Sequence, residues 1–405
     1  MSRKIGVSLM RKFHLASHDE IKSGNTTDIY FIRTREILKE KQLENIKVTM
    51  EVTASSLPKK WPWGILCGLD EVANLFEGVP IDIFAMPEGS VFYARDYNYV
   101  KEPIIVIQGK YSDFCLLETP LLGLICQASG VATKSARIRK IAGNAQLISF
   151  GIRRIHPGLS PMIDRAAYIG GMDGVSSLSG AKTINKKPIG TMPHSLIILF
   201  GEQMKAWKAY DEVMPNEVPR IALIDTYYDE KTEAILATEI LKDKLYGVRI
   251  DTPSSRKGDF EDIIREVRWE LDIRGFKDVK IFVSGGLDEE NIGSLKKAGV
   301  FGFGVGTSIS NAPTIDFAMD IVEVEGRPSA KRGKLGGVKQ SWRCPECMVD
   351  IVRLRDDNSP KCPLCSGSTK PMLVPLIENG QIVADIPEID SIRKRVLKQI
   401  SKINL

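Results

Sequence analysis

The sequence predicts an α/β protein centred on an incomplete α/β barrel of about seven strands, with an α+β sandwich domain and a small zinc-binding C-terminal module. Residues 145–305 alternate short apolar runs with helical patterns, which is the order that builds a parallel sheet. Residues 46–115 carry several strand patterns with little helix between them, and two Cys-x-x-Cys pairs follow residue 340. A doubly wound open sheet is the alternative, but no strand–Gly-x-Gly-x-x-Gly–helix unit supports it.

Length and composition are those of an ordinary globular protein. A chain of 405 residues exceeds the ~250–300 residues at which a single core stops growing. We therefore expect a sandwich domain at 1–118, a barrel at 119–315, and a C-terminal segment at 316–405 that returns to the sandwich and carries a zinc knuckle at about 340–372. The net charge of +5 does not imply nucleic acid and fits an anionic substrate equally well.

The sequence gives no sign of a membrane or secreted protein. No apolar run reaches the ~18 residues of a membrane span, and the first residues lack the apolar segment and cleavage site of a signal peptide. We therefore expect a cytoplasmic protein without a membrane partner, in a compartment where thiols stay reduced.

The first part of the chain should form the sandwich. After a flexible arm at 1–20, Thr27 or Asp28 can cap a helix at 32–44, and Tyr30 stands where an aromatic ring could stack on a flat heterocycle. Alternation of period two predicts a strand at 46–53, and helical spacing predicts a helix at 61–77 that begins with an exposed Trp-Pro-Trp. Three more short strands are expected at 81–86, 91–94 and 104–107.

A long helix at 116–141, opened by Pro120 and ended by Gly143, should connect the sandwich to the barrel. The barrel strands are then expected at 145–150, 174–178, 189–192, 220–225, 247–251, 280–284 and 302–305. The intervening helices are expected at 161–169, 195–212, 229–243, 259–273 and 288–298. A strand at 317–324, a basic loop at 326–334, a strand pair near 372–386 and a basic helix at 389–403 complete the chain.

Four of the seven cysteines form a pattern typical of a metal site. They are Cys344, Cys347, Cys362 and Cys365, two Cys-x-x-Cys knuckles with fourteen residues between them. This spacing predicts a tetrahedral zinc site, and four thiolates leave no open coordination position, so the zinc would be structural. A redox dithiol needs only one such pair, and a nucleic-acid-binding ribbon would need an aromatic and basic face that residues 348–357 lack. The three single cysteines are expected to be buried and inert.

The glycine-rich turns after the last two strands predict a phosphate site. Ser284, Gly285 and Gly286 end one strand, and Gly304, Gly306 and Thr307 end the next. Barrel enzymes bind phosphate at the loops after their final strands, where backbone N–H groups approach an anion unhindered by a Cβ. Tight turns without a ligand are the alternative.

Other polar residues stand at the ends of the earlier strands. Arg153 and Arg154 suit a carboxylate or phosphate, although neighbours on an extended strand point to opposite sides. Arg249 and Asp251 share one face, and Asp225 ends the preceding strand, so the two acids could bind a metal or ribose. The remaining candidates are Ser176 and Ser177, Thr191, Thr226, and His194 at a helix start where a phosphoryl group would be stabilised.

Taken in order, these motifs resemble nicotinate phosphoribosyltransferase. The motifs are Thr27-Asp28-Ile-Tyr30, Phe150-Gly-Ile-Arg-Arg154, Gly190-Thr-Met-Pro-His194, Arg249-Ile-Asp251 and Gly304-Val-Gly-Thr307. The zinc knuckle is similar to that of archaeal members, and residues 124–142 look like the bridging helix of the related quinolinate enzymes. The resemblance covers roughly residues 20–390.

The resemblance implies a type II phosphoribosyltransferase that assembles at least as a homodimer with active sites shared between subunits. Tyr30 would reach across the dimer to stack on nicotinate, with Arg249 on the other face of the ring. Arg153 and Arg154 would lie near the nicotinate carboxylate and phosphoribosyl pyrophosphate, and the glycine turns would hold the 5′-phosphate. His194 matches a position that is phosphorylated in members coupling ATP hydrolysis to the reaction.

Two departures from the family pattern concern ATP coupling. The usual Arg-x-Asp-Ser-Gly-Asp is here a longer loop from Arg249 to Asp259, and the Ala usually found before the histidine is Pro193. The expected reaction is displacement of pyrophosphate by the pyridine nitrogen, which needs no general base, with Mg²⁺ balancing the charge of pyrophosphate. Quinolinate or nicotinamide as the pyridine remains an alternative, and a zinc-ribbon nucleic-acid-binding protein is an alternative of another class.

Overall fold

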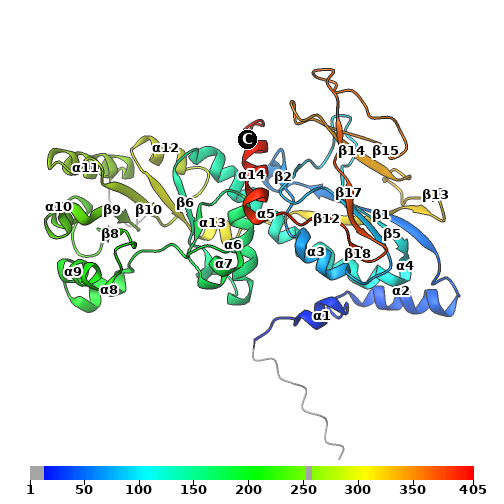
Figure 1. Cartoon of the computed structure of the whole chain (residues 1–405), viewed down its shortest axis with the longest axis horizontal. Coiled ribbons are helices and arrows are strands. Elements are labelled where there is room, and N and C mark those ends of the chain that lie inside the picture. Colours follow the sequence, from blue (N-terminus) through cyan, green and yellow to red (C-terminus); the bar gives the residue numbers. More distant parts are fainter. Residues whose placement is uncertain (1–12, 252–257) are drawn as a thin grey trace, which may run out of the picture.

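The computed structural model describes residues 13–251 and 258–405. It shows two bodies side by side, a parallel sheet wrapped by helices at one end and a mainly antiparallel sheet at the other (Figure 1). Helices α5 (Glu118–Ala142) and α14 (Ile389–Ile400) lie between them. The predicted fold class, a partial barrel beside a sandwich with a C-terminal cysteine module, is confirmed.

The parallel sheet has six strands in the part of the chain that the structure describes, in the order β7-β6-β11-β10-β9-β8. The strands are β6 (Gln146–Ser149), β7 (Gly174–Val175), β8 (Arg220–Leu223), β9 (Leu245–Ile250), β10 (Lys280–Ser284) and β11 (Gly302–Val305). Most of their side chains are buried, as expected when helices cover a parallel sheet. The end strands β7 and β8 do not pair, so the barrel is open between them.

The strand predicted at 189–192 is wrong. Ile189 donates one backbone hydrogen bond to Val175, 2.9 Å long, and the segment is otherwise irregular. Pro188 and Pro193 flank the run, and proline has no N–H to contribute to a strand ladder. The helix predicted at 195–212 is likewise interrupted, because Gly201 at φ 70° separates α8 (His194–Phe200) from α9 (Gln203–Val213).

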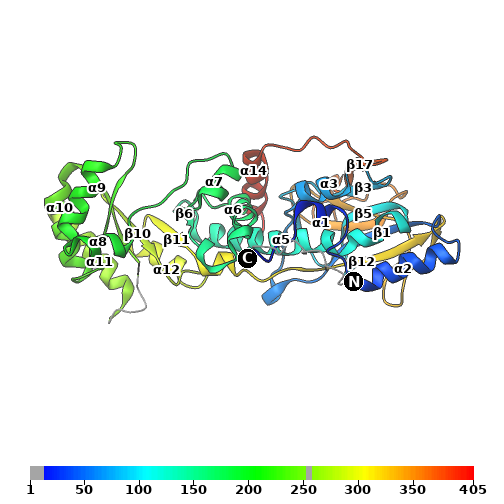
Figure 2. The same ribbon diagram turned by 90° about the horizontal axis from the view of Figure 1, so that it is seen from below.

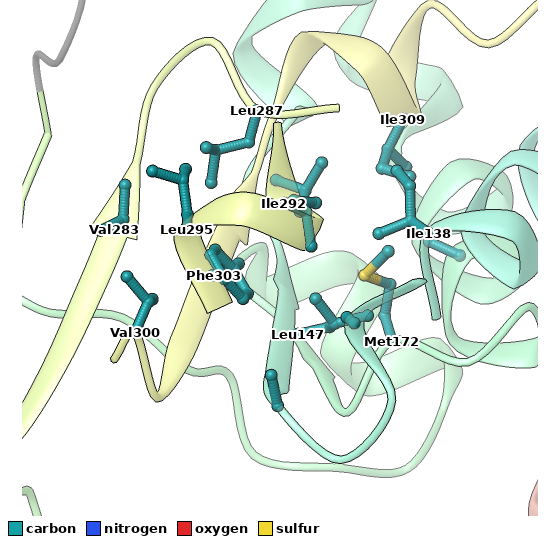
Figure 3. Packing of buried hydrophobic residues seen from close by; sticks show 14 of the residues in the cluster. Ile138, Leu147, Met172, Val283, Leu287, Ile292, Leu295, Val300, Phe303 and Ile309 are labelled. Atoms are coloured by element: carbon teal, nitrogen blue, oxygen red, sulfur yellow. The ribbon is translucent and has the colours of Figure 1, made fainter. Parts of the chain in front are cut away.

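The other helices cover the sheet. They are α6 (Ser160–Ile169), α7 (Leu178–Thr183), α10 (Glu230–Leu241), α11 (Phe260–Ile273), α12 (Ile292–Lys297) and α13 (Thr307–Ser310). Those predicted at 161–169, 229–243 and 259–273 are confirmed, the one predicted at 288–298 is shorter, and two short helices after β7 and β11 were not predicted. Figure 3 shows how Ile292 and Leu295 of α12 pack between strands β10 and β11 and the bridging helix. This apolar layer fixes the strands and therefore the loops at their carboxyl ends.

The sandwich is built on a seven-stranded sheet, counted over the described residues, in the order β13-β12-β1-β5-β3-β17-β18. Its strands are β1 (Lys47–Ser56), β3 (Asp82–Ala85), β5 (Pro103–Lys110), β12 (Asp316–Val324), β13 (Arg327–Pro328), β17 (Val374–Glu378) and β18 (Gln381–Ile382). Neighbouring strands pair antiparallel, and α3 (Leu69–Phe76) buries its apolar face in the same core. Helix α2 (Ile29–Glu40) lies at the outer end (Figure 1).

The helix predicted at 61–77 is wrong over its first half. Residues 64–65 form the short strand β2 (Gly64–Ile65), paired with β4 (Val91–Phe92), and the helix begins only after Gly68 at φ 101°. Pro62 and the two glycines disfavour helix over this stretch. The tryptophans expected to be exposed, Trp61 and Trp63, are buried.

Helix α5 belongs to both cores. Leu121 and Ile125 pack with the sandwich, whereas Val131 and Ile138 pack with the barrel. By length and composition alone the segment Tyr111–Ala142 could cross a membrane, but 61% of its most apolar window is buried inside the protein, as for a core helix. Its apolar character is therefore explained by packing.

The cysteine module lies on the sandwich. Strands β14 (Lys339–Arg343), β15 (Asp350–Leu354) and β16 (Lys370–Pro371) form a small sheet that carries the two knuckles. The hydroxyl of Tyr93 donates to the carbonyl of Met348 over 2.6 Å, and Ser341 donates to the carbonyl of Pro103 over 3.0 Å. The chain then crosses to the barrel, where the Tyr168 hydroxyl donates to Asp390 of α14 over 2.6 Å.

Candidate active site

The ends of three neighbouring strands bring Asp225, Asp251 and Ser284 together. The backbone N–H of Asp251 donates to Asp225 Oδ2 over 2.8 Å, and the Ser284 hydroxyl donates to Asp251 Oδ1. The parallel register of β8, β9 and β10 sets these contacts, because it places the three carboxyl ends at one edge. The result is a pair of oriented carboxylates next to a hydroxyl.

His194 faces the same pair of acids from the start of α8. Its Nδ1 is 3.0 Å from the hydroxyl of Thr226, and its Nε2 is 3.7 Å from both Asp225 Oδ1 and Asp251 Oδ2. Pro193 occupies the N-cap and makes no side-chain cap. The histidine predicted as a site residue thus faces both predicted acids.

Arg249 lies between these acids and a large cavity. Its Nη2 donates to the carbonyl of Met192 over 2.9 Å. The pKa of the guanidinium is lowered, mainly by burial and to a smaller extent by the nearby Arg153. The carboxylates of Asp251 and Asp225 act in the opposite direction and raise it. The side chain is therefore a partly buried cation, with its Nε enclosed, within electrostatic reach of two carboxylates and a second arginine.

The cavity has a volume of about 800 Å³ and lies against the open concave face of the parallel sheet. Phe150, Thr191, Arg249 and Gly304 line it, together with apolar residues of β9 and β10. Among the described residues, Thr191 Oγ1, Arg249 Nε and His194 Nε2 are buried without a hydrogen-bond partner. Such atoms are uncommon in folded proteins. Thr191 and Arg249 line the cavity and His194 faces the two acids beside it, so the three atoms mark a ligand site with an apolar wall.

The two glycine turns lie side by side because β10 and β11 pair in parallel, with Ser284 opposite Gly304. Gly285 and Gly286 have φ values of 89° and 65°, a conformation that disfavours any side chain. A Cβ at position 304 would stand 2.4 Å from the ring of Phe150. The turns therefore present bare backbone, as a phosphate cradle requires.

The remaining residues of the second turn start a short helix. Gly306 has φ −103° and ψ −105° and directly precedes α13, whose first residue is Thr307. The next residue, Ser308, donates from its hydroxyl to the carbonyl of Leu287 over 2.7 Å and so ties the two glycine loops together. The predicted phosphate residues are thus gathered at the last two strand ends.

Arg153 and Arg154 lie in a short 3₁₀ turn (Ile152–Arg154), so they do not alternate as strand neighbours would. Both side chains are exposed, and in the described part of the chain neither makes an ion pair. Gly151 permits the turn, because a Cβ there would be 2.6 Å from the carbonyl oxygen of Gly306. The turn therefore presents both cations near the second glycine turn.

A buried acid that the sequence did not single out organises the first two strand ends. Asp164 of α6 accepts hydrogen bonds from the Ser149 hydroxyl over 3.0 Å and from the Ser177 hydroxyl over 2.5 Å. Burial raises the pKa of Asp164 to about 6, against the lowering effect of the two hydroxyls. The feature of the sequence that could have identified Asp164 is an acid on the otherwise apolar face of a helix. Ser176, predicted to bind substrate, lies beside this network and donates its N–H to Ser149.

Tyr30 is the one predicted binding residue that a single chain does not bring to the site. It is the second residue of α2, with 54% of its surface exposed. This helix lies on the sandwich, apart from the parallel sheet (Figures 1 and 2). The ring of Tyr30 contacts Phe31, with centroids 4.3 Å apart. A second copy of the chain would be needed to bring it to the barrel.

The four cysteines cluster with all sulfurs within 4.8 Å of one another, which suits a tetrahedral metal site. The two knuckles repeat the same hydrogen bonds. The N–H of Met348 donates to the backbone carbonyl of Cys344, and the N–H of Ser366 donates to the backbone carbonyl of Cys362, both over 2.9 Å. Both donor residues have positive φ. The cluster lies on the sandwich, and in the described part of the chain no hydrogen bond or ion pair joins it to the strand-end residues.

Comparisons with known proteins agree with this arrangement. Residues 28–129 match the family model of the quinolinate phosphoribosyl transferase N-terminal domain, and residues 131–320 match its C-terminal domain. A nicotinate phosphoribosyltransferase of Mycobacterium tuberculosis is 31% identical over 352 residues, which cover 82% of this chain and 72% of that protein. One from Bacillus subtilis is 30% identical over 250 residues, covering 60% and 49%.

Solved structures extend the likeness. The crystal structure of nicotinate-nucleotide pyrophosphorylase from Pyrococcus furiosus has a TM-score of 0.93 and 53% identity, covering 98% of this chain and all of that one. Human nicotinic acid phosphoribosyltransferase has a TM-score of 0.73 and 18% identity, covering 93% and 94%, and shares the fold.

Asp164 predicts a pH effect on stability. It keeps its proton up to about pH 6 in the fold but loses it near pH 4 in the unfolded chain. Between these values the folded state binds more protons, so stability falls as the pH rises, by up to about 3 kcal/mol from this group. Urea unfolding of wild type and D164N from pH 4 to 7 should show a difference that changes by this amount. The exposed D262N should follow wild type, and a pH-independent difference would contradict the assignment.

Proposed function

This chain belongs to the nicotinate phosphoribosyltransferase family, and we propose that it transfers the phosphoribosyl group of phosphoribosyl pyrophosphate to nicotinate in NAD salvage. The products are nicotinate mononucleotide and pyrophosphate. The observation that carries the proposal is the sequence of groups along one sheet edge. In the order of the sheet, the cations follow β6, bare glycine turns end β11 and β10, and carboxylates end β9 and β8.

This order matches the charges of the reactants. The 5′-phosphate would bind the glycine turns, the ribose would lie over Asp225 and Asp251, and the pyridine would enter the cavity beside Arg249. The ring nitrogen attacks C1′, and the bond from C1′ to pyrophosphate breaks with its electron pair going to the leaving group. Positive charge develops on the sugar, and the two carboxylates stabilise it electrostatically. The nitrogen carries no proton, so alignment replaces a general base.

Mg²⁺ is expected to accompany pyrophosphate. Asp225 Oδ1 and Asp251 Oδ2, which both face His194, are hard oxygen donors of the kind that Mg²⁺ prefers, so the residues present suit this ion. When bound, the ion would offset the negative charge of the leaving group. Ser284 and the Asp251 backbone hold the two carboxylates in place whether or not the ion is bound.

The cations support a pyridine with a single carboxylate. Arg153 and Arg154 are exposed and without ion pairs in the described chain, so they can receive one carboxylate. The neighbouring β6 and β7 ends carry the hydroxyls of Ser149 and Ser177, bonded to Asp164. For a second carboxylate, as in quinolinate, these two strand ends offer hydroxyls over a buried acid and not a further cation. Nicotinamide would leave the arginines without an anionic partner.

We also propose that the active site is completed by a second copy of the chain. Tyr30 is half exposed, and among residues 13–251 and 258–405 its ring contacts Phe31 and no barrel residue, so a homodimer would place it on the pyridine ring. Its aromatic face and the Arg249 guanidinium would then enclose the ring from both sides, an arrangement that favours a flat heterocycle.

ATP coupling, if present, would act through His194. The Thr226 hydroxyl is hydrogen-bonded to Nδ1 of the ring, so Nε2 is the nitrogen that remains to accept a phosphoryl group. Two carboxylates stand 3.7 Å from that atom and would repel a phosphate without a cation between them. The longer loop after Asp251 falls on residues 252–257, outside the described residues.

For the cysteine cluster we propose structural zinc. Four thiolates within 4.8 Å, two matching knuckles and attachment to the sandwich support a metal that stabilises the fold and takes no part in the transfer. A reducing cytoplasm would keep the thiolates available.

The substrate assignment is tested by incubating the protein with phosphoribosyl pyrophosphate, Mg²⁺ and nicotinate, quinolinate or nicotinamide, then measuring mononucleotide and pyrophosphate. We expect product with nicotinate and at least about a hundredfold lower kcat/KM with the other two, because one cation site fits one carboxylate. Product from quinolinate alone would refute the proposal. Adding ATP and looking for acid-labile phosphate on wild type but not on H194A tests coupling.

Metal analysis tests the zinc proposal. The purified protein should contain one zinc per chain, and C362S should lose it together with a fall in melting temperature, since structural zinc contributes folding energy. C126S, a thiol outside the cluster, should retain zinc. Full zinc content in C362S would contradict the assignment.

A further inference from the structure

Glu289 lies three residues after the first glycine turn and joins two cations of helix α5. Its Oε2 is 2.5 Å from Lys134 Nζ, and its Oε1 is 2.7 Å from Arg137 Nε. The exposed fractions of the side chains are 6% for Lys134, 15% for Arg137 and 16% for Glu289, so water and salt screen the charges only weakly. The transfer chemistry described above uses none of these three side chains.

The ion pairs matter because the preceding turn has little rigidity of its own. Gly285 and Gly286 both adopt positive φ, and glycine loses more conformational freedom on folding than any other residue. Asn291 Nδ2 donates to the Gly286 carbonyl over 2.9 Å, and Ser308 holds the carbonyl of Leu287. These bonds join the turn to its own loop and to the neighbouring loop, whereas Glu289 joins it to a helix buried in both domains.

Arg137 extends this connection to the sandwich. Its guanidinium carbon lies 5.3 Å from the ring centroid of Trp61 and 5.9 Å from that of Trp63, both buried. Cation–π contacts of this kind restrain the guanidinium while leaving its edge available for hydrogen bonds. Glu289 therefore binds a cation that is itself held in place, and the phosphate turn is fixed relative to two indole rings and α5.

We propose that Glu289 is a positioning residue whose ion pairs with Lys134 and Arg137 hold the Ser284–Gly286 turn in the geometry that receives the phosphate of phosphoribosyl pyrophosphate. This inference rests on the proposed function. Glu289 does not itself bind the substrate, because a bare carboxylate would repel the phosphate. Pairing with two cations removes that repulsion and leaves the cluster with a net positive charge.

The test compares E289Q, which keeps the shape and removes the charge, with E290Q. Glu290 is the exposed neighbour in the same loop and makes no ion pair within the described residues. Binding of phosphoribosyl pyrophosphate with Mg²⁺ is measured by calorimetry, and both substrates are varied in steady-state kinetics. We expect E289Q to raise the KM and Kd for phosphoribosyl pyrophosphate about tenfold, to change kcat less than about threefold, and to leave the KM for nicotinate unchanged. E290Q should match wild type.

A second variant tests the same ion pairs from the side of helix α5. K134M removes the partner of Glu289 from the helix side and should shift the KM for phosphoribosyl pyrophosphate in the same direction; it decides the matter if E289Q does not fold. A lower melting temperature with an unchanged KM in these variants would mean that the ion pairs serve stability alone, and would overturn the proposal. If wild type neither binds phosphoribosyl pyrophosphate nor forms mononucleotide, the proposed function fails instead.

Discussion

The close packing of helix α5 against both domains is the constraint on which the rest of the structure depends. A Cβ at Gly130 would lie 2.2 Å from the carbonyl oxygen of Pro313, and one at Gly170 would lie 2.3 Å from that of Ala132. The backbone of α5 thus approaches the chain after β11 and the end of α6 as closely as atoms allow. Ser129 and Thr133 also accept hydrogen bonds from the backbone N–H groups of residues 67 and 65 in the sandwich. One helix therefore sets the position of the strand ends relative to the sandwich.

The strand ends differ in the charge that they present to the site. The barrel is open, so its concave face is a cavity with an apolar wall, and Arg249 lies between this cavity and two carboxylates. An anionic pyridine, a phosphate and a sugar that becomes cationic fit this order of groups along the sheet edge, from cation through bare glycine backbone to acid. The acids Asp225 and Asp251 are held by hydrogen bonds within the barrel, so the field they create is present before substrate binds.

Much of the fold and of the candidate site was predictable from the sequence, and the wrong predictions have physical causes. Buried strands, acids and glycine turns are local patterns, so residues 145–305 and the four cysteines were found from sequence. Flanking prolines removed the strand expected at 189–192, and Pro62 with two glycines shortened the helix expected at 61–77. Asp164 was missed because an acid on a helix reveals its role only when Ser149 and Ser177 are seen to converge on it.

In the proposed dimer, the contact of Tyr30 with the pyridine ring forms between two copies of the chain, so neither local sequence patterns nor the packing of one chain specifies it. Mixing two variants tests the central claim, a strand-edge site completed by a second copy. Y30A and D251N should each be inactive, and a co-expressed mixture should regain about a quarter of wild-type activity, since half of randomly paired dimers carry one intact site. Activity in the mixture no higher than the sum of the separate variants, or full activity in Y30A alone, would contradict the account.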